Sequence, residues 1–526
     1  MKSKVILILP PDSSDFDTFK LPSWEIIRIP PVGLIAIGSY VHEKGYEVKI
    51  IDCRELIVAN KTNDYIPIVL KTIDEFRPDV IGINMLTATF DEATNISREL
   101  KNKYPNLLII AGGPHPSVEP ELTFQQNQYI DAICIGAGEE VCLDILDGKK
   151  TSAIPGLMRR DHTDRYEQRK VEMDLDKYPF PNYSLANADY TTLTVNTLTG
   201  WCFRGLSAIS SRSCPYSCKF CASDWSKPFR FHSPEYVIEM VKYLSTFNID
   251  VIPFMDDTIS IVKERLHKIC RGFIKAKLFY PHTHLRWYAQ MRADQMDPDT
   301  LKLMKEAGCF GVSFGAESGS DRMLKIINKR TTVELNTRVS KYIEEAGLYL
   351  AASFMLGIPG ETEADMEETI TFMKKLPTHA KGFGSFRPLP GSPFYDEFIA
   401  NGTLKKEELD WSNLGNFSKP PEYLFCDVSR EKFDEIFDKA SVVATRDKWT
   451  ALHEDTFLKY PEIKEIATRE RIKICKPDNY QSSAHIDYPR ISFNLIKSIL
   501  IALLRTYLPL GIRRKIRAIR RRRASQ

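Results

Sequence analysis

Short apolar runs rich in β-branched residues alternate with amphipathic stretches in two separate parts of this 526-residue chain. Strands that alternate with helices pair in parallel, because each helix crosses back over the sheet before the next strand begins. The first 150 residues are therefore expected to form an α/β domain with a Rossmann-like, doubly wound parallel sheet. Its strands are expected at 4–9, 47–52, 79–85, 107–111 and 131–135, and its helices at 33–44, 65–76, 90–103 and roughly 138–147.

The same alternation returns after residue 200 and predicts a second α/β domain over 201–395. Six strand–helix units with right-handed crossovers make a partial, TIM-like (β/α)6 barrel, whose active face lies at the carboxyl ends of its strands. The expected strands are 206–213, 250–256, 285–293, 309–317, 348–357 and 380–388. The expected helices are 234–247, 259–277, 298–307, 332–346 and 363–376.

The remaining segments have weaker patterns. Residues 151–200 are rich in Pro, Asn, Asp and Thr and are expected to form a linker. A mainly helical C-terminal region is expected to follow the barrel, with a mixed or helical cap over 396–490 that includes an amphipathic helix from 431 to 452. An amphipathic helix and a basic tail complete the chain over 491–526.

Composition indicates an ordinary soluble globular protein, with 43% apolar and 27% charged residues. The eleven cysteines show no spacing typical of a disulfide framework, and the N-terminus does not resemble a signal peptide. A cytoplasmic location is therefore expected. The net charge of +3 is unevenly spread, because residues 513–523 carry eight positive charges and the rest of the chain has a net charge of about −5.

The C-terminal segment 491–523 predicts peripheral contact with the inner face of the cell membrane. Residues 491–512 are apolar but are interrupted by Lys497, Arg505 and Pro509, so a helix lying in the interface is favoured over a spanning one. The basic residues beside it would favour an anionic leaflet. The alternative is that the helix packs on the protein and the tail is solvated. RNA contact ranks third, because aromatic residues are not interleaved, and no specific nucleic acid is expected.

Three cysteines, Cys214, Cys218 and Cys221, follow the first expected barrel strand in the spacing C-x3-C-x2-C. Three thiolates can hold three corners of a 4Fe-4S cluster and leave one iron without a protein ligand. An iron of that kind can bind and reduce a substrate or cofactor. Structural zinc requires four ligands, and no fourth Cys or His stands at a matching spacing.

Polar residues gather at the carboxyl ends of the other expected barrel strands. Helix capping explains any one of them, and Arg292 has Asp294 nearby as a partner. Five such strand ends of six nevertheless favour a shared binding site. The residues that we single out there are Asp256, Asp257, Arg292, Glu317, Ser318, Gly360 and Glu363.

The strand ends of the N-terminal sheet are rich in glycine, which lets backbone approach a large flat or phosphate-bearing ligand. A dinucleotide site would show G-x-G-x-x-G after the first strand, and residues 9–14 read Leu-Pro-Pro-Asp-Ser-Ser, which argues against NAD. The candidate binding residues at these ends are Thr87, Gly112, Gly113, His115, Gly136 and Glu139.

The cysteine loop, with Phe220 before its last cysteine, resembles that of the radical S-adenosylmethionine (SAM) superfamily. The N-terminal set Pro-Pro-x-Gly-Leu, Gly-Gly-Pro-His and Gly-x-Gly-Glu resembles the cobalamin-binding domain fused to many radical SAM enzymes. The resemblance covers about two-thirds of the chain. It implies an enzyme with a 4Fe-4S cluster held by the three cysteines, SAM and cobalamin. It also implies an electron donor such as flavodoxin or ferredoxin.

The resemblance also implies roles for individual barrel residues. Glu317 and Ser318 fit the strand that binds the SAM ribose or carboxylate, whereas Ile358, Gly360 and Glu363 fit the strand that cradles adenine. Phe220 fits a position near the base. Asp256 and Asp257 fit the methionine amino group of SAM or the substrate. Arg292 lies at the same carboxyl edge of the barrel strands. The sequence departs from the superfamily at Leu356, where the fifth-strand motif begins with a glycine.

A second departure concerns the cobalt ligand. Corrinoid proteins that ligate cobalt with histidine use D-x-H-x-x-G, and the nearest match here, around His42, lacks the Asp and lies at the end of the first expected helix. We therefore expect no histidine on the cobalt.

The implied reaction is reductive cleavage of SAM to a 5′-deoxyadenosyl radical, followed by methyl transfer to an unactivated carbon. Cyclisation or rearrangement without methylation is the nearest alternative. A methylthiotransferase is a second, although only Cys53, Cys134 and Cys142 precede the linker to hold its second cluster. A non-enzymatic cobalamin or redox sensor is a third. The sequence assigns no catalytic residue and does not separate a small-molecule from a lipid substrate.

Overall fold

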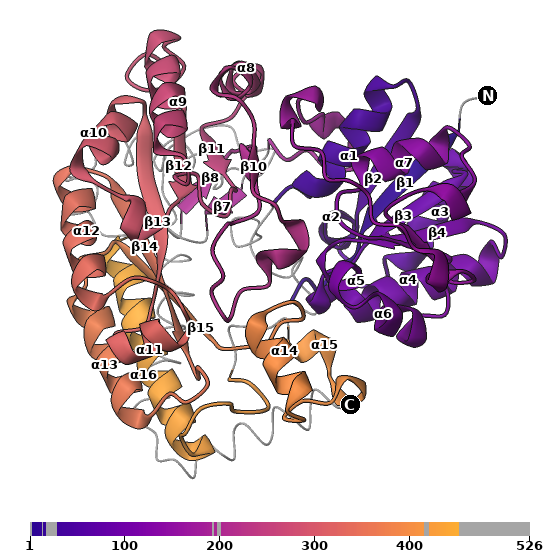
Figure 1. Ribbon diagram of the computed structural model, residues 1–526. Coiled ribbons are helices and arrows are strands. Elements are labelled where there is room, and N and C mark those ends of the chain that lie inside the picture. The colour runs from indigo at the N-terminus through magenta and orange to yellow at the C-terminus, as the bar shows by residue number, and fades with distance from the viewer. Residues whose placement is uncertain are drawn as a thin grey trace.

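The protein is described by a computed structural model over residues 3–12, 14–16, 29–191, 194–196, 201–414 and 420–451 (Figure 1). Two α/β domains lie side by side, the N-terminal domain in indigo and purple and the barrel domain in magenta to orange. The predicted cap beyond residue 451 and the predicted amphipathic helix and basic tail over 491–526 lie outside the described residues.

The N-terminal sheet has the strand order β2-β1-β3-β4-β5-β6, parallel except for β6, which runs antiparallel to β5. Alternate residues of β1 enter opposite cores, Val5 and Leu7 on one face and Ile6 and Ile8 on the other, because successive side chains of a strand point to opposite faces. The strands are β1 Lys4–Leu9, β2 Glu47–Asp52, β3 Val80–Asn84, β4 Leu108–Gly112, β5 Ala132–Cys134 and β6 Leu157–Arg159.

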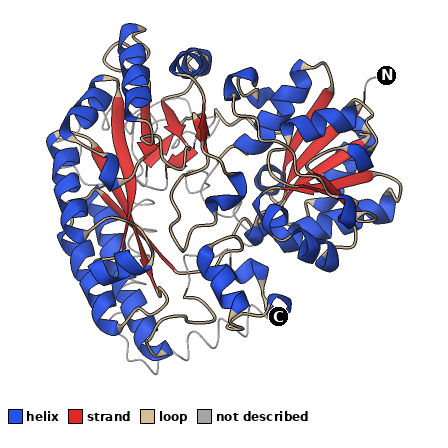
Figure 2. Ribbon diagram, in the orientation of Figure 1, coloured by secondary structure: helices blue, strands red, loops and turns tan. Residues whose placement is uncertain are grey.

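Helices cover both faces of this sheet, as expected for a doubly wound fold (Figure 2). The four predicted helices are present, and three shorter ones were not predicted. The helices are α1 Val32–Glu43, α2 Cys53–Asn60, α3 Ile66–Phe76, α4 Phe90–Lys103, α5 Pro114–Val118, α6 Pro120–Gln126 and α7 Glu139–Leu146.

The barrel domain has a five-stranded parallel sheet in the order β11-β12-β13-β14-β15, with helices along its outer face (Figure 2). Its strands are β11 Val251–Phe254, β12 Arg286–Gln290, β13 Cys309–Glu317, β14 Tyr349–Leu356 and β15 Ala380–Ser385. Its helices are α8 Pro234–Leu244, α9 Lys263–Lys275, α10 Pro298–Glu306, α11 Asp321–Ile326, α12 Val333–Glu345 and α13 Glu363–Lys375.

The predicted first barrel strand, 206–213, differs from expectation. This segment makes only isolated parallel bridges to β11, at Gly205–Val251 and Ala208–Phe254. Its end forms β9 (Ser211–Arg212), which pairs antiparallel with β10 (Arg230–Phe231). Just before β9, the buried Asp256 carboxylate accepts hydrogen bonds from the Ser210 backbone and from the Ser210 and Ser211 hydroxyls, which hold this segment beside the end of β11.

The predicted linker is not a loose connection in its described part. Its strand β6 extends the N-terminal sheet, which therefore continues beyond the predicted boundary at residue 150. Buried tyrosines then tie the segment to both domains. Tyr190 donates a hydrogen bond to Asp52 Oδ2 over 2.8 Å, and the Tyr183 hydroxyl donates to the Ser207 carbonyl in the barrel domain.

After the barrel come α14 (Pro393–Ala400), α15 (Trp411–Leu414) and α16 (Arg430–Ala451). Helix α16, predicted from its amphipathic pattern, packs against β15 and α13. Helix α15 returns to the N-terminal domain, where Trp411 Nε1 donates to Gln126 Oε1 over 2.6 Å.

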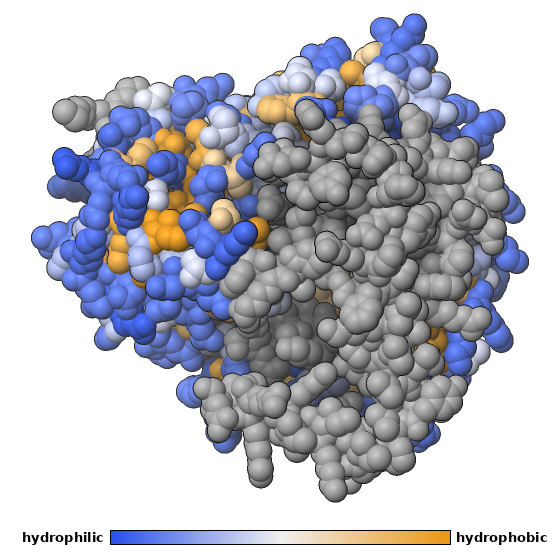
Figure 3. All heavy atoms as spheres, turned by 180° about the vertical axis from the view of Figure 1, so that it is seen from behind, coloured by the Kyte–Doolittle hydropathy of each residue, from blue (hydrophilic) through white to orange (hydrophobic). Residues whose placement is uncertain are grey.

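Within the described residues no helix is long and apolar enough to cross a membrane. Seen from behind, apolar side chains gather in places on the otherwise hydrophilic N-terminal domain (Figure 3).

Candidate active site

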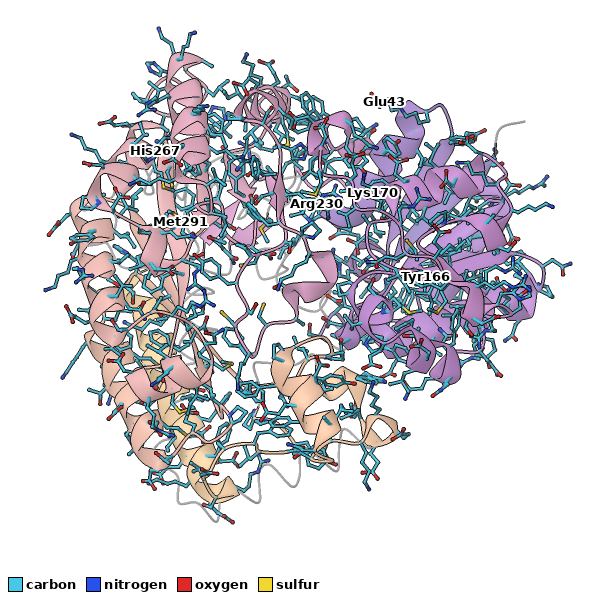
Figure 4. The ribbon with its side chains drawn as sticks, viewed as in Figure 1. Glu43, Tyr166, Lys170, Arg230, His267 and Met291 are labelled. Carbon is cyan, nitrogen blue, oxygen red and sulfur yellow. The ribbon has the colours of Figure 1, made fainter. Side chains whose placement is uncertain are left out.

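A cavity of about 460 Å³ lies where the two domains meet. The N-terminal domain contributes strand-end glycines and apolar residues of β1, β3 and α1. The segment 166–172 and the β9–β10 ribbon contribute polar residues, including Tyr166, Lys170 and Arg230, which Figure 4 labels. Ser213 and Asp257 line the same cavity, so it extends to the start of the cysteine loop.

Four of the predicted N-terminal site residues line this cavity: Gly112, Gly113, Gly136 and Glu139. Gly113 has φ of 107°, and a Cβ there would lie 2.9 Å from the Met85 carbonyl oxygen. Only glycine fits that position without strain. The backbone is therefore bare along the carboxyl edge of β4, next to the cavity.

Thr87 and His115 do not line the cavity, which differs from their prediction as cofactor-binding residues. The His115 ring is 1% exposed and lies between Phe90 and Trp411, with ring centroids 4.9 and 4.8 Å away. Thr87 Oγ1 lies 3.3 Å from its Nδ1. Burial lowers the pKa of His115 to about 4, so this ring is a neutral core residue.

The cysteine loop is fixed by backbone contacts from two directions. The Lys219 N–H donates to the Ile327 carbonyl, and its carbonyl accepts from the Phe394 N–H, both over 3.0 Å. Cys218 is buried and Cys214 and Cys221 are half-buried. Burial, followed in part by the neighbouring thiols and Asp257, raises the pKa of Cys214 and Cys221.

Arg292 supports this loop and is not a free cation at the barrel mouth. Its guanidinium stacks over the Tyr216 ring at 3.7 Å and pairs with Asp294 through two bonds of 3.0 Å. Its Nη1 also donates to Cys218 Sγ over 3.8 Å. Hydrogen bonds to sulfur tune an iron–sulfur cluster.

Glu317 ends β13 in a left-handed conformation, with φ of 60°, at a register shift between β13 and β14. Its carboxylate accepts a hydrogen bond of 2.7 Å from Lys329 Nζ, and both side chains are about one-tenth exposed. Lys329 also lies 5.7 Å from the Phe220 ring centroid. The structure thus brings Glu317, Phe220 and the unpredicted Lys329 together beside the cysteine loop. Backbone strain of this kind in a non-glycine residue is typical of functional sites.

The other predicted SAM-binding residues have different surroundings. Ser318 is buried and its hydroxyl lies 3.1 Å from Thr369 Oγ1 of α13. Ile358 is buried in an aromatic cluster with Phe386 and Phe394. Gly360 has φ of 72° and open space where a Cβ would lie. Glu363 is exposed and pairs with Lys432 of α16 over 2.8 Å, so its carboxylate is already engaged outside this group.

The adjacent Asp256 and Asp257 differ in burial. Asp256 is fully buried and holds Ser210 and Ser211, so it supports the chain before the cysteine loop and does not reach the cavity. Asp257 is exposed and lines the cavity. Partial desolvation and then the neighbouring Asp256 raise the pKa of Asp257.

The donor set fits an iron–sulfur cluster. The described residues contain no group of three or more His, Cys, Asp or Glu side chains arranged to hold a single metal ion. A four-iron cluster instead places each thiolate on a different iron. One loop here supplies three thiols, and Arg292, after β12, donates a hydrogen bond to one of them. The glycine-lined edge fits a flat macrocycle, because no side chains obstruct the backbone there.

Comparison with known proteins agrees with this geometry. Residues 208–373 match the radical SAM superfamily, and residues 28–146 match the B12 binding domain. An uncharacterized methyltransferase of Pyrococcus horikoshii is 31% identical over 422 residues, covering 76% of this chain and 84% of the relative. Cytidylyl-2-hydroxyethylphosphonate methyltransferase of Streptomyces wedmorensis is 25% identical, covering 72% and 79%.

Among solved structures, the radical SAM methyltransferase TsrM from Kitasatospora setae, with cobalamin and a 4Fe-4S cluster bound, has a TM-score of 0.63. It is 18% identical and the match covers 76% of this chain and 78% of that one, which supports the fold. The chain belongs to the radical SAM superfamily and carries a B12-binding domain. The predicted family, α/β fold, enzymatic nature and cofactors (4Fe-4S cluster, SAM and cobalamin) are confirmed, whereas the roles of individual residues stay predictions.

Proposed function

We propose that this protein transfers a methyl group from SAM to an unactivated carbon of a small-molecule or lipid substrate, with cobalamin as the intermediate carrier. One observation carries the proposal. A single cavity is bounded by the glycine edge of the B12-binding domain on one side and by Ser213 and Asp257, next to the cysteine loop, on the other. Reacting groups held across such a cavity are close and shielded from water.

The residues of the barrel divide into cofactor ligands and supports. Cys214, Cys218 and Cys221 hold the cluster and leave one iron for SAM. When bound, the cluster supplies the electron that cleaves SAM and cobalamin supplies a methyl carrier. Lys329 offers a cation to the carboxylate of SAM, and Glu317 offers a carboxylate to the amino group or the hydroxyls of SAM. The two side chains form a charged pair with little exposure, and charged hydrogen bonds are stronger than neutral ones.

The adenine of SAM is assigned to the end of β14. Gly360 leaves open space in its backbone, and the buried Ile358 supplies an apolar floor. Phe220 supplies an aromatic surface beside Lys329. Asp257 is the exposed carboxylate of the cavity wall, and its raised pKa suits it to hold or accept a proton there.

A methylthiotransferase is disfavoured by the positions of the N-terminal cysteines. Such an enzyme would hold a second cluster in this domain. Cys53 is buried in the core on one face of the sheet, whereas Cys134 is buried in the core on the other face. These two thiols therefore do not share a site.

Product analysis tests the proposal and separates methyl transfer from ring formation. Anaerobically reconstituted protein with cobalamin, SAM and a reductant should form both 5′-deoxyadenosine and S-adenosylhomocysteine, because one SAM is cleaved and another gives up its methyl group. A cyclising or rearranging enzyme would form 5′-deoxyadenosine without S-adenosylhomocysteine. Absence of both products would contradict an enzymatic role for the cluster.

A flavodoxin or ferredoxin is the electron donor in this proposal. The 5′-deoxyadenosine yield should be supported by reduced flavodoxin in place of dithionite. If no small electron-transfer protein supported turnover, the proposed electron donor would be refuted.

Peripheral membrane contact through residues 491–523 is also part of the proposal. It rests on the sequence pattern, because this segment lies outside the described residues. Full-length protein should sediment with anionic liposomes, whereas a variant truncated after residue 490 should not. Recovery of both proteins in the supernatant would refute the contact.

A further inference from the structure

Two arginines face each other in the wall of the cavity. In the antiparallel ribbon, Arg212 of β9 lies directly opposite Arg230 of β10. Like charges in directly opposite positions of a strand pair repel and destabilise the pair. Both residues line the cavity, as does Lys170, and Figure 4 shows Arg230 between the two domains.

One of these arginines forms an ion pair with a carboxylate, whereas the other forms none with the described side chains. Arg212 Nη2 pairs with Glu139 of the N-terminal domain over 2.7 Å. No carboxylate among the described side chains forms an ion pair with Arg230, which is only 5% exposed. Its Nη1 donates to the Glu172 carbonyl over 3.1 Å, and its Nη2 lies 3.5 Å from the Ser226 carbonyl. Its Nε has no hydrogen-bond partner in the part of the chain that the structure describes.

Other acidic residues around the cavity are engaged elsewhere. Glu140 and Glu172 both pair with Lys177, over 2.6 and 2.8 Å. His232 beside the ribbon contributes no second cation, because burial and then Arg212 lower its pKa to about 4. Glu139 attracts Arg230 electrostatically but forms its ion pair with Arg212, so the two buried guanidinium groups share one carboxylate among the described side chains. A buried charge is costly unless it is paired.

We propose that Arg230, together with Arg212, forms an anion-binding site that holds a carboxylate or phosphate group of the substrate in the cavity. The inference rests on the proposed function and adds the chemical class of the substrate. Arginine suits this role, since its planar fork donates two parallel hydrogen bonds to a carboxylate or phosphate. An anion between the two guanidinium groups would relieve their repulsion across the ribbon.

Binding of inorganic pyrophosphate to the anaerobically reconstituted holoenzyme, measured by calorimetry, tests the site. Wild-type protein should bind one pyrophosphate per chain, and Arg230→Met should weaken the affinity by at least about tenfold, the usual effect of losing a charged hydrogen bond. Arg230→Lys, which keeps the charge and preserves folding, should fall between the two. Arg338→Met is the matched control, because Arg338 lies on α12 with a half-exposed side chain. Its affinity should equal that of wild type.

Two further measurements identify the source of the anion. Cobalt content and SAM affinity of Arg230→Met should match those of wild type if the substrate supplies the group. Loss of cobalamin would assign Arg230 to the cofactor's phosphodiester, and loss of SAM affinity would assign it to the SAM carboxylate; either result overturns the inference. Equal pyrophosphate binding by wild type and Arg230→Met, or none by wild type, also overturns it. Product formation by wild type tests the proposed function separately.

Discussion

The two walls of the proposed active site, namely the N-terminal side of the cavity and the barrel residues around the cysteine loop, differ in how they can recognise a ligand. The N-terminal wall presents bare backbone at Gly112, Gly113 and Gly136 beside apolar strand residues. The barrel side presents charged side chains that are already paired with protein groups, such as Glu317 with Lys329 and Arg292 with Asp294. A wall of backbone and apolar groups selects by shape, and a wall of fixed charges selects by electrostatics. The first suits a large flat macrocycle and the second a small zwitterion.

Removal of the cysteines should have the largest effect and should be confined to the barrel side. Changing Cys214, Cys218 and Cys221 to Ala removes every protein ligand of the cluster, so 5′-deoxyadenosine formation should be abolished. The Cys53→Ala variant is the control, because Cys53 is buried in the N-terminal core. Turnover by the triple variant would refute the cluster assignment.

Breaking the Glu317–Lys329 pair should have the next largest effect. Glu317→Ala leaves the Lys329 ammonium buried without its partner, which typically costs roughly 3–5 kcal/mol. We expect Glu317→Ala to lower the rate of 5′-deoxyadenosine formation at least about tenfold and to retain its far-UV circular dichroism. Arg292→Ala should also lower this rate. Glu334→Ala, on the exposed face of α12, serves as the control. A wild-type rate for Glu317→Ala would remove it from the site.

A methyl group at Gly113 should disturb the opposite wall. The left-handed φ and the contact with the Met85 carbonyl oxygen should together cost about 1–3 kcal/mol in unfolding free energy and lower cobalamin retention. Gly148→Ala isolates the two causes, because Gly148 has φ of 77° but nothing within 4 Å of a Cβ. Equal losses of stability in the two variants, measured by chemical denaturation, would show that the close contact has no effect.

The expected effect that is confined to acid pH is a pH dependence of the unfolding free energy from His115. Its folded-state pKa is lowered to about 4, so the unfolded chain binds the extra proton first as pH falls. The contribution is complete above pH about 6.5 and is lost as pH falls toward 4, at up to about 1.4 kcal/mol per pH unit. His115→Phe should show a shallower fall of unfolding free energy over this range. Identical slopes would indicate that His115 is not buried as a neutral ring.

The sequence predicted the regular elements well where the apolar pattern was unbroken. Strands β1 and β2 and helix α4 have the predicted bounds, because short apolar runs and an amphipathic repeat decide them locally. The short helices α2, α5 and α6 were missed, since each has at most eight residues and little periodicity. The first barrel strand was wrong in form, because its end pairs with β10 and its earlier part makes only isolated bridges to β11.

The site was predictable where chemistry is encoded in spacing, as in the cysteine loop. Lys329 was missed, because it reaches Glu317 from a turn twelve residues away and no motif marks it. Arg230 was missed for the same reason, although Arg212, two residues before Cys214, could have been noticed. Asp256, His115 and Glu363 were predicted from their positions at strand ends, and burial or a local partner gives each a different setting.

The most direct test of the two-wall account is the metal content of variants directed at each wall. Iron and cobalt are measured in anaerobically reconstituted wild type, the triple cysteine variant and Gly113→Ala. Wild type should hold about four irons and one cobalamin per chain. The cysteine variant should lose iron and keep cobalamin, and Gly113→Ala should lose cobalamin and keep iron. Iron retained in the cysteine variant, or the loss of both metals from both variants, would contradict the assignment of one cofactor to each wall.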